Sequence, residues 1–148
     1  MSDQEQILQQ KYIELQMLDQ QIKQVQQQHS ILQQQVEELM RLDIDLDDLT
    51  KVKENSKAFF PLSAGVFVEG SINNTKELLI NVGADVSVKK TIPEAKSLIQ
   101  EQIKELQEAL MNIDNNLKFA DLKAHELQEE IIQLDCKMHH DHKKGHKY

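Results

Sequence analysis

The chain has 148 residues, a formal net charge of −8 at pH 7, no Trp and only 4% aromatic residues. Large aromatic side chains supply much of the buried area of a small core, so this composition favours long helices that bury aliphatic side chains along seams. The negative charge argues against nucleic acid or an anionic membrane as the main partner, because both attract clustered Lys and Arg.

The cysteine content and hydropathy bear on the compartment. The one cysteine, Cys136, cannot form an internal disulfide. No apolar leader opens the chain, and no stretch approaches the roughly 20 apolar residues of a membrane span. We therefore expect a protein of the reducing cytoplasm without a membrane span, in which Cys136 is an ordinary thiol rather than a redox centre.

The N-terminal region, residues 1–57, has the heptad pattern of a coiled-coil helix. Apolar residues recur at alternating steps of three and four, and they are Leu15, Leu18, Ile22, Val25, Leu32, Val36 and Leu39. His29 occupies one position of the same series, where we expect it to set the register of the pairing. Beyond residue 39 the pattern predicts a displaced seam through Leu42, Leu46 and Leu49, with a local change of supercoil near Arg41.

The region 91–138 has a second and longer array. Its members are Ile99, Ile103, Leu106, Leu110, Ile113, Leu117, Ala120, Ala124, Leu127, Ile131, Leu134 and Met138. Thr91 followed by Glu94 three residues later is typical of a capping box, and Pro93 is tolerated in a first turn. Two apolar stripes of similar length on either side of a middle segment predict an antiparallel coiled coil within one chain.

The middle segment, residues 58–90, has the alternation of β-strands. Strands are predicted at residues 65–72, 77–82 and 85–89, and a further short strand at 59–62 would complete two linked hairpins. Asn73-Asn74 suits a turn with positive φ, and Gly83-Ala84 suits a second tight connection. The predicted fold is therefore mainly α with a small β module, a long antiparallel two-helix coiled coil joined by two β-hairpins.

Isolated hairpins of this size are marginal in water, and their edges offer unpaired hydrogen-bonding groups. We therefore expect other subunits to complete the β module. The predicted oligomerisation residues are Val66, Phe67, Val68, Ile72, Leu78, Leu79, Ile80, Val82, Val86 and Val88.

The ends of the two helices near the chain termini carry more aliphatic residues than one seam can cover. We expect part of this set to be open to a partner or client protein, while a continuous packed seam that hides much of it is the alternative. The candidate client-binding residues are Ile7, Leu8, Tyr12, Ile13, Leu127, Ile131, Ile132, Leu134 and Met138.

The stretch PLSAGVFVEGSINNTKELLINVGADVSVKKTIPEAKSLIQ, residues 61–100, together with the two arrays resembles the α-class subunit of prefoldin, the type with two hairpins. The resemblance implies a heterohexamer of two α-class and four β-class subunits, whose hairpins form a double β-barrel that carries six coiled coils. It further implies that unfolded proteins are held between the distal coil ends without ATP and are passed to a group II chaperonin. The alternative is a structural coiled-coil tether or scaffold subunit that binds no client.

Two patterns suggest metal ions but favour simpler explanations. Asp43, Asp45, Asp47 and Glu54 match positions 1, 3, 5 and 12 of a calcium loop, but Asp48 stands where the loop requires Gly. We expect a solvated acidic helix face there. Residues 139–148 are rich in His and Lys, and we expect a disordered tail rather than a built metal site.

An enzymatic reading finds no support in the sequence. We find no Gly-rich phosphate loop, no nucleophile elbow and no pair of carboxylates placed for catalysis. We therefore expect no catalytic activity, no cofactor and no metal.

Overall fold

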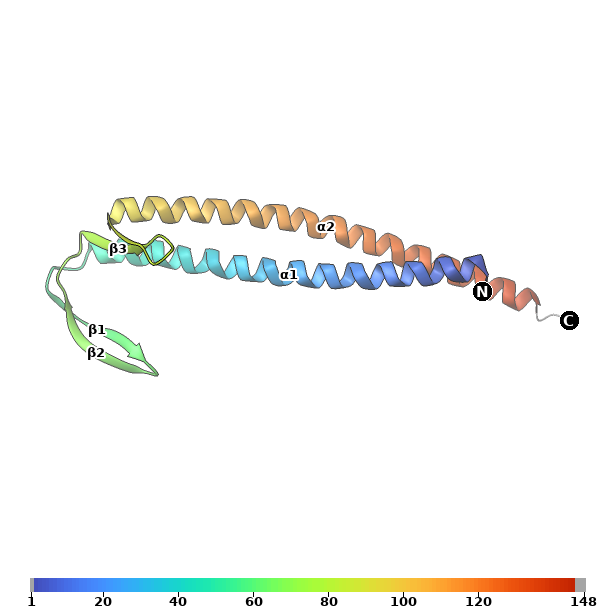
Figure 1. Ribbon diagram of the computed structural model, residues 1–148, viewed down its shortest axis with the longest axis horizontal. Coiled ribbons are helices and arrows are strands. Elements are labelled where there is room, and N and C mark those ends of the chain that lie inside the picture. The colour runs from blue at the N-terminus through green and yellow to red at the C-terminus, as the bar shows by residue number, and fades with distance from the viewer. Residues whose placement is uncertain (1, 146–148) are drawn as a thin grey trace. The chain divides into compact units, whose positions relative to one another are not determined.

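The computed structural model describes residues 2–145, with side chains through residue 139. Two long helices, α1 (Asp3–Thr50) and α2 (Ile92–Gly145), flank four short strands. The strands are β1 (Ser56–Ser63), β2 (Val66–Ile72), β3 (Glu77–Asn81) and β4 (Ser87–Thr91) (Figure 1). This confirms the predicted fold class of two helices joined by two hairpins.

The element boundaries differ somewhat from the ranges assigned on the sequence. Helix α1 ends at Thr50 rather than near residue 57, and β1 begins at Ser56. Helix α2 continues past residue 138 to Gly145, so much of the tail expected at 139–148 is helical backbone. Residues 146–148 of that tail lie outside the described residues.

The chain divides into two compact units. The terminal unit consists of residues 1–33 and 108–148, and the hairpin unit consists of residues 34–107. In the terminal unit α1 and α2 run antiparallel, because Lys11 pairs with Glu130 and His29 pairs with Asp114. All members of the second array, Ile99 to Met138, are buried or half-buried, as the periodicity predicts.

The seam of α1 does not shift near Arg41, which corrects the sequence-based prediction. The alternation continues from Leu39 through Asp43 to Leu46, while Leu42 is 43% exposed. The physical reason is the partner of Asp43: its carboxylate lies 4.0 Å from Lys96 Nζ on α2, so the charged side chain has an opposite charge beside it in the seam.

Strands β1 and β2 form one antiparallel sheet of the hairpin unit. Their register runs from Ser56 opposite Ile72 to Pro61 opposite Phe67, with a bulge before Ser63. The two-residue loop Ala64-Gly65 has φ values of 51° and 79°. Two positive φ angles are the mark of a type I′ turn, whose twist matches that of the flanking strands.

The predicted turn with positive φ at Asn73-Asn74 is wrong. Neither residue has a positive φ, and β2 pairs with β1 rather than with β3. Asn74 instead accepts hydrogen bonds through Oδ1 from the backbone N–H of Lys76, at 2.9 Å, and of Glu77, at 3.2 Å. This local bonding shapes an open link between two separate sheets.

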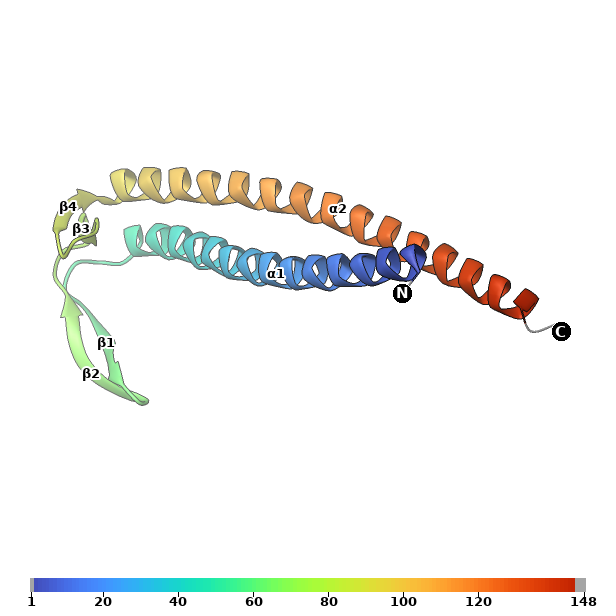
Figure 2. The same cartoon turned by 45° about the vertical axis from the view of Figure 1, so that its right-hand side comes forward.

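Strands β3 and β4 form the second sheet (Figure 2), with Glu77 opposite Thr91 and Asn81 opposite Ser87. Gly83, Ala84 and Asp85 all have positive φ, as a tight connection requires, which agrees with the turn predicted at Gly83-Ala84. Thr91 is the last residue of β4, and its Oγ1 accepts the Glu94 N–H at 3.3 Å. Thr91 therefore caps α2 as predicted.

The apolar core of the hairpin unit lies between the helices and the β3–β4 hairpin. Buried Leu46 of α1 contacts Ala95 and Ile99 of α2, along with Ile92 in the first turn of α2. Leu78 and Ile80 of β3 pack against this cluster. One face of the second hairpin is thus covered within the chain.

Candidate interaction surfaces

The first candidate surface is the β1–β2 hairpin together with the outward face of β3–β4. Six of the predicted oligomerisation residues are exposed: Val66, Phe67, Val68, Leu79, Val82 and Val86. Four are half-buried: Ile72, Leu78, Ile80 and Val88. Because Leu78 and Ile80 pack on the intrachain core, the apolar surface left open for another subunit is formed by the other eight.

The sequence-based set omitted the apolar side chains of β1. Phe59 is 71% exposed and Leu62 68% exposed, and Phe60 is 41% exposed. Strand pairing places Phe60 opposite Val68, on the same face of the sheet as Ile72. The signal that identifies them is the Ala64-Gly65 turn, which makes residues 56–63 a full partner of β2.

Gly70 shapes this face of the first hairpin. A Cβ placed on Gly70 would lie 2.8 Å from Cε2 of Phe60, so the aromatic ring lies directly over the glycine. The backbone of Gly70 takes an ordinary conformation, so the glycine is required here by space rather than by φ. The result is a continuous exposed surface of aromatic and β-branched side chains.

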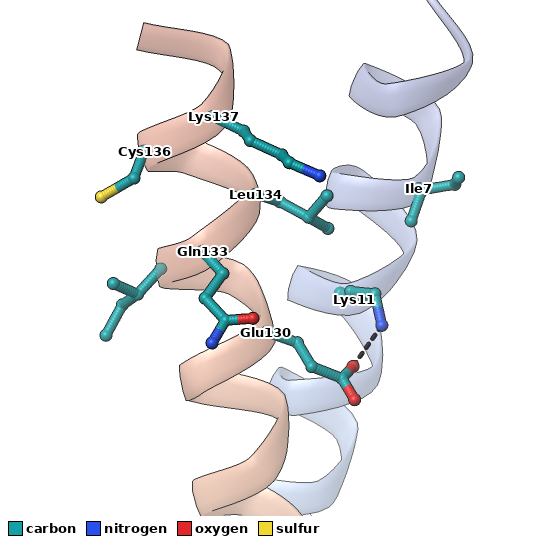
Figure 3. A pocket seen from close by; sticks show the side chains of 8 residues that line it. Ile7, Lys11, Glu130, Gln133, Leu134, Cys136 and Lys137 are labelled. Carbon is teal, nitrogen blue, oxygen red and sulfur yellow. Dashed lines mark hydrogen bonds and ion pairs between the residues drawn. The ribbon is translucent and has the colours of Figure 1, made fainter. Parts of the chain in front are cut away.

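The second candidate surface is a groove in the terminal unit (Figure 3). It is lined by Ile7, Lys11, Glu130, Ile132, Gln133, Leu134, Cys136 and Lys137. Leu134 points across the groove toward α1, while the Cys136 thiol points away from α1. An ion pair between Lys11 and Glu130 closes one end of the groove.

The predicted client-binding residues divide into two groups in this unit. Ile7, Tyr12, Ile13 and Ile132 are exposed, with exposed fractions between 45% and 61%. Leu8, Leu134 and Met138 are half-buried, and Leu127 and Ile131 are buried in the seam. The seam therefore takes the second group and leaves the first group open. Lys11, Glu130 and Cys136 are groove residues that the sequence reasoning did not include.

Three charged or polar side chains of α1 occupy seam positions, and each faces an opposite charge on α2. Lys11 pairs with Glu130, and His29 Nε2 lies 2.9 Å from Asp114 Oδ1. In the hairpin unit, Lys96 hydrogen-bonds Asp47 and lies beside Asp43. The hydrogen bond from Asp47 raises the pKa of the Lys96 ammonium above its ordinary value, Asp43 adds to this effect, and partial burial opposes it.

The calcium pattern on α1 does not form a loop. The backbone remains helical through Thr50, and Asp43 and Asp47 are both directed at Lys96. Among the residues whose side chains are described, no group of three or more His, Cys, Asp or Glu is arranged to hold a metal ion. Within the same residues, neither helix has a stretch long and apolar enough to cross a bilayer.

Comparison with known proteins agrees with this architecture. The model of the prefoldin family, described as a prefoldin subunit, matches residues 18–135. The chain is 33% identical over 94 residues to a prefoldin subunit alpha of Methanobrevibacter smithii, and this match covers 64% of each of the two chains. It is 26% identical over 137 residues to a prefoldin subunit alpha of Methanococcus aeolicus, covering 88% of this chain and 92% of that one.

A solved structure shows the same fold. A chain in the cryo-EM structure of filamentous PFD from Methanocaldococcus jannaschii superposes with a TM-score of 0.70 at 19% sequence identity. The match covers 78% of this chain and 96% of that one. The family model spans both helices and both hairpins, and the relatives are alpha subunits. The chain therefore belongs to the prefoldin family, as a subunit of the archaeal alpha type.

Proposed function

We propose that this chain is the α-class subunit of an ATP-independent chaperone of the cytoplasm, which captures unfolded proteins at the ends of its coiled coils and delivers them to a group II chaperonin. Its partners in this proposal are β-class prefoldin subunits, in an assembly of two α-class and four β-class chains. The chain performs no catalysis in this role and needs no cofactor.

The observation that carries the proposal is the placement of exposed apolar residues outside the helical seam. In the terminal unit the seam is already filled by Leu127, Ile131 and their neighbours, and Ile7, Tyr12 and Ile132 remain exposed beside it. Exposed apolar side chains next to a groove offer binding energy to any apolar segment, with little demand for a specific sequence. Such a surface suits a protein that holds many different clients.

The hairpin surface supports assembly with other subunits. Phe59, Phe67 and Leu79 are each at least 60% exposed, and both sheets have only two strands, so every strand has an unpaired edge. Burying these side chains and edges against other subunits would satisfy both the apolar surface and the backbone groups. The alternative role, a tether without clients, uses this surface but not the groove.

The test separates capture of clients from assembly. The assembly with β-class subunits is reconstituted, and its suppression of aggregation of a chemically denatured protein is measured by light scattering without nucleotide. Replacing the exposed residues of the terminal unit in the variant I7S/Y12S/I13S/I132S should reduce the suppression several-fold, while size-exclusion chromatography with light scattering shows an unchanged assembly. Unchanged suppression by an intact assembly would favour the tether.

A matched control is available on the same helix. Ile13 and Ile31 are both 56% exposed, but Ile31 lies away from the groove residues in sequence. Ile31→Ser removes the same side chain with the same exposure, so it should leave the suppression of aggregation unchanged. Transfer to the chaperonin is measured separately, by the recovery of a folded client after adding a group II chaperonin and ATP.

A further inference from the structure

The apolar layers of the seam do not by themselves define one register. The second array alternates steps of four and three from Ile99 to Met138 without a break, and nearly all of its members are Leu, Ile or Ala. Sliding α2 along α1 by one heptad, seven residues, again brings apolar layers against apolar layers over most of the length. Some other feature has to distinguish the observed register from its neighbours.

The charged seam positions supply that distinction. In the observed register Lys11 lies on Glu130. A shift of seven residues in one direction puts Lys11 opposite Lys137, and a shift in the other direction puts it opposite Lys123. Both neighbouring registers therefore replace an ion pair with two like charges.

Lys96 discriminates in the same way in the hairpin unit. It lies on Asp43 and Asp47 in the observed register. A shift of one heptad in one direction leaves it opposite Val36 and Met40, and a shift in the other direction leaves it opposite Thr50 and Glu54, at and beyond the end of α1. Asp43 is half-buried, so losing its cation would leave a carboxylate in the seam without a counter-charge.

His29 contributes less to this selection. Its partner Asp114 would be replaced by Asp121 in one shifted register and by Gln107 in the other. An acidic partner is thus retained in one of the two shifts. The discrimination rests on Lys11 in the terminal unit and on Lys96 in the hairpin unit.

We infer that Lys11–Glu130 and Lys96 with Asp43 and Asp47 form a pairing code that fixes α1 on α2 in a single register. These pairs exclude the two shifts of one heptad through like charges or unpaired charges, in addition to stabilising the native alignment. The inference concerns the chain alone and does not depend on client binding.

The experiment reads the register of the terminal unit by disulfide cross-linking of the full chain in a Cys136→Ser background. Ile22 and Ala120 line the same small cavity, so I22C/A120C reports the observed register. I22C/L127C and I22C/I113C report the two shifted registers. Each pair is oxidised under mild conditions, and the cross-linked fraction is quantified by gel mobility.

The decisive variant is Lys11→Glu. It places a carboxylate opposite Glu130 in the observed register, but opposite Lys137 or Lys123 in the shifted ones. We expect the ratio of observed to shifted cross-links to fall roughly threefold to fivefold, as partly exposed charge pairs permit. The double variant K11E/E130K restores an ion pair and should restore the ratio.

The matched control is Lys23→Glu, which makes the same charge change at an exposed position outside the seam. A ratio in Lys11→Glu within experimental error of that in Lys23→Glu would overturn the inference. Loss of helical circular dichroism in Lys11→Glu that K11E/E130K does not repair would also overturn it, because the pair would then be structural without directing alignment.

Discussion

The ring of Phe60 lies over Gly70, at a distance that leaves no room for a Cβ atom. The two residues are diagonal neighbours across the β1–β2 ladder, since Phe60 is opposite Val68 and Gly70 is opposite Ala58. The contact fixes where the aromatic side chain lies on an exposed face. The geometry of that face is therefore sensitive to a single methyl group.

Gly70→Ala should weaken assembly through the hairpin surface. The added methyl group would displace the Phe60 ring, and overpacking of this kind costs about 1–3 kcal/mol. We expect weaker association with β-class subunits, measured by size-exclusion chromatography with light scattering across a dilution series. Ser71→Ala, an exposed change at the next residue, is the control. Equal association of the two variants would show that the ring position is unimportant.

The loop Ala64-Gly65 allows a prediction with two opposite signs. Both residues have positive φ, which Asn adopts more readily than Ala and which a β-branched residue strongly disfavours. Ala64→Asn should therefore raise stability by a few tenths of a kcal/mol, and Gly65→Val should lower it by about 1–3 kcal/mol. Thermal unfolding of the assembled protein measures both. A loss of stability in Ala64→Asn would contradict the assigned turn.

His29→Leu should raise the stability of the terminal unit. A polar residue at a seam position specifies register at a cost in stability, so an apolar replacement should increase the denaturant midpoint. The substitution leaves Asp114 without its ion pair, but Asp114 is 54% exposed and stays hydrated. Urea unfolding followed by circular dichroism tests this, and a lower midpoint would mean that the ion pair outweighs the cost of a polar seam residue.

The ion pairs of Lys96 predict a dependence of stability on alkaline pH. Because the folded state raises the pKa of Lys96 above 10.5, the contribution is fully present below that value and is lost as pH rises through the folded pKa. Lys96→Met should lower stability at pH 7 and flatten the part of the stability profile above pH 10.5 that comes from this group. Lys104→Met, at an exposed position of the same helix, is the control. Profiles of the same steepness in both variants would refute the assignment.

The sequence predicts the helices well because their burial repeats locally every three or four residues. The second array and the Thr91 cap are both found as predicted, since each depends on residues close together in the chain. Asp43 was missed as a seam residue because its partner Lys96 is far away in sequence. An apolar pattern cannot identify a charge whose counter-charge comes from another helix.

The strand pairing was harder to predict for a different reason. Asn73-Asn74 has the composition of a hairpin turn, whereas Ala64 is not a residue that usually takes positive φ. The pairing of β1 with β2 nevertheless gives the turn to Ala64-Gly65. The same error hid Phe59, Phe60 and Leu62 from the expected surface, since their strand was assigned only four residues. Tertiary pairing outweighed local turn preference here.

The junctions of the two helices with the sheets are unequal. Thr91 ends β4 and caps α2 with no residue in between, whereas residues 51–55 separate α1 from β1. A tilt of the second hairpin is therefore transmitted to the first turn of α2 as by a rigid lever. The five-residue link on the other side works as a slack cord, so strain arising in the first hairpin is absorbed before it reaches α1.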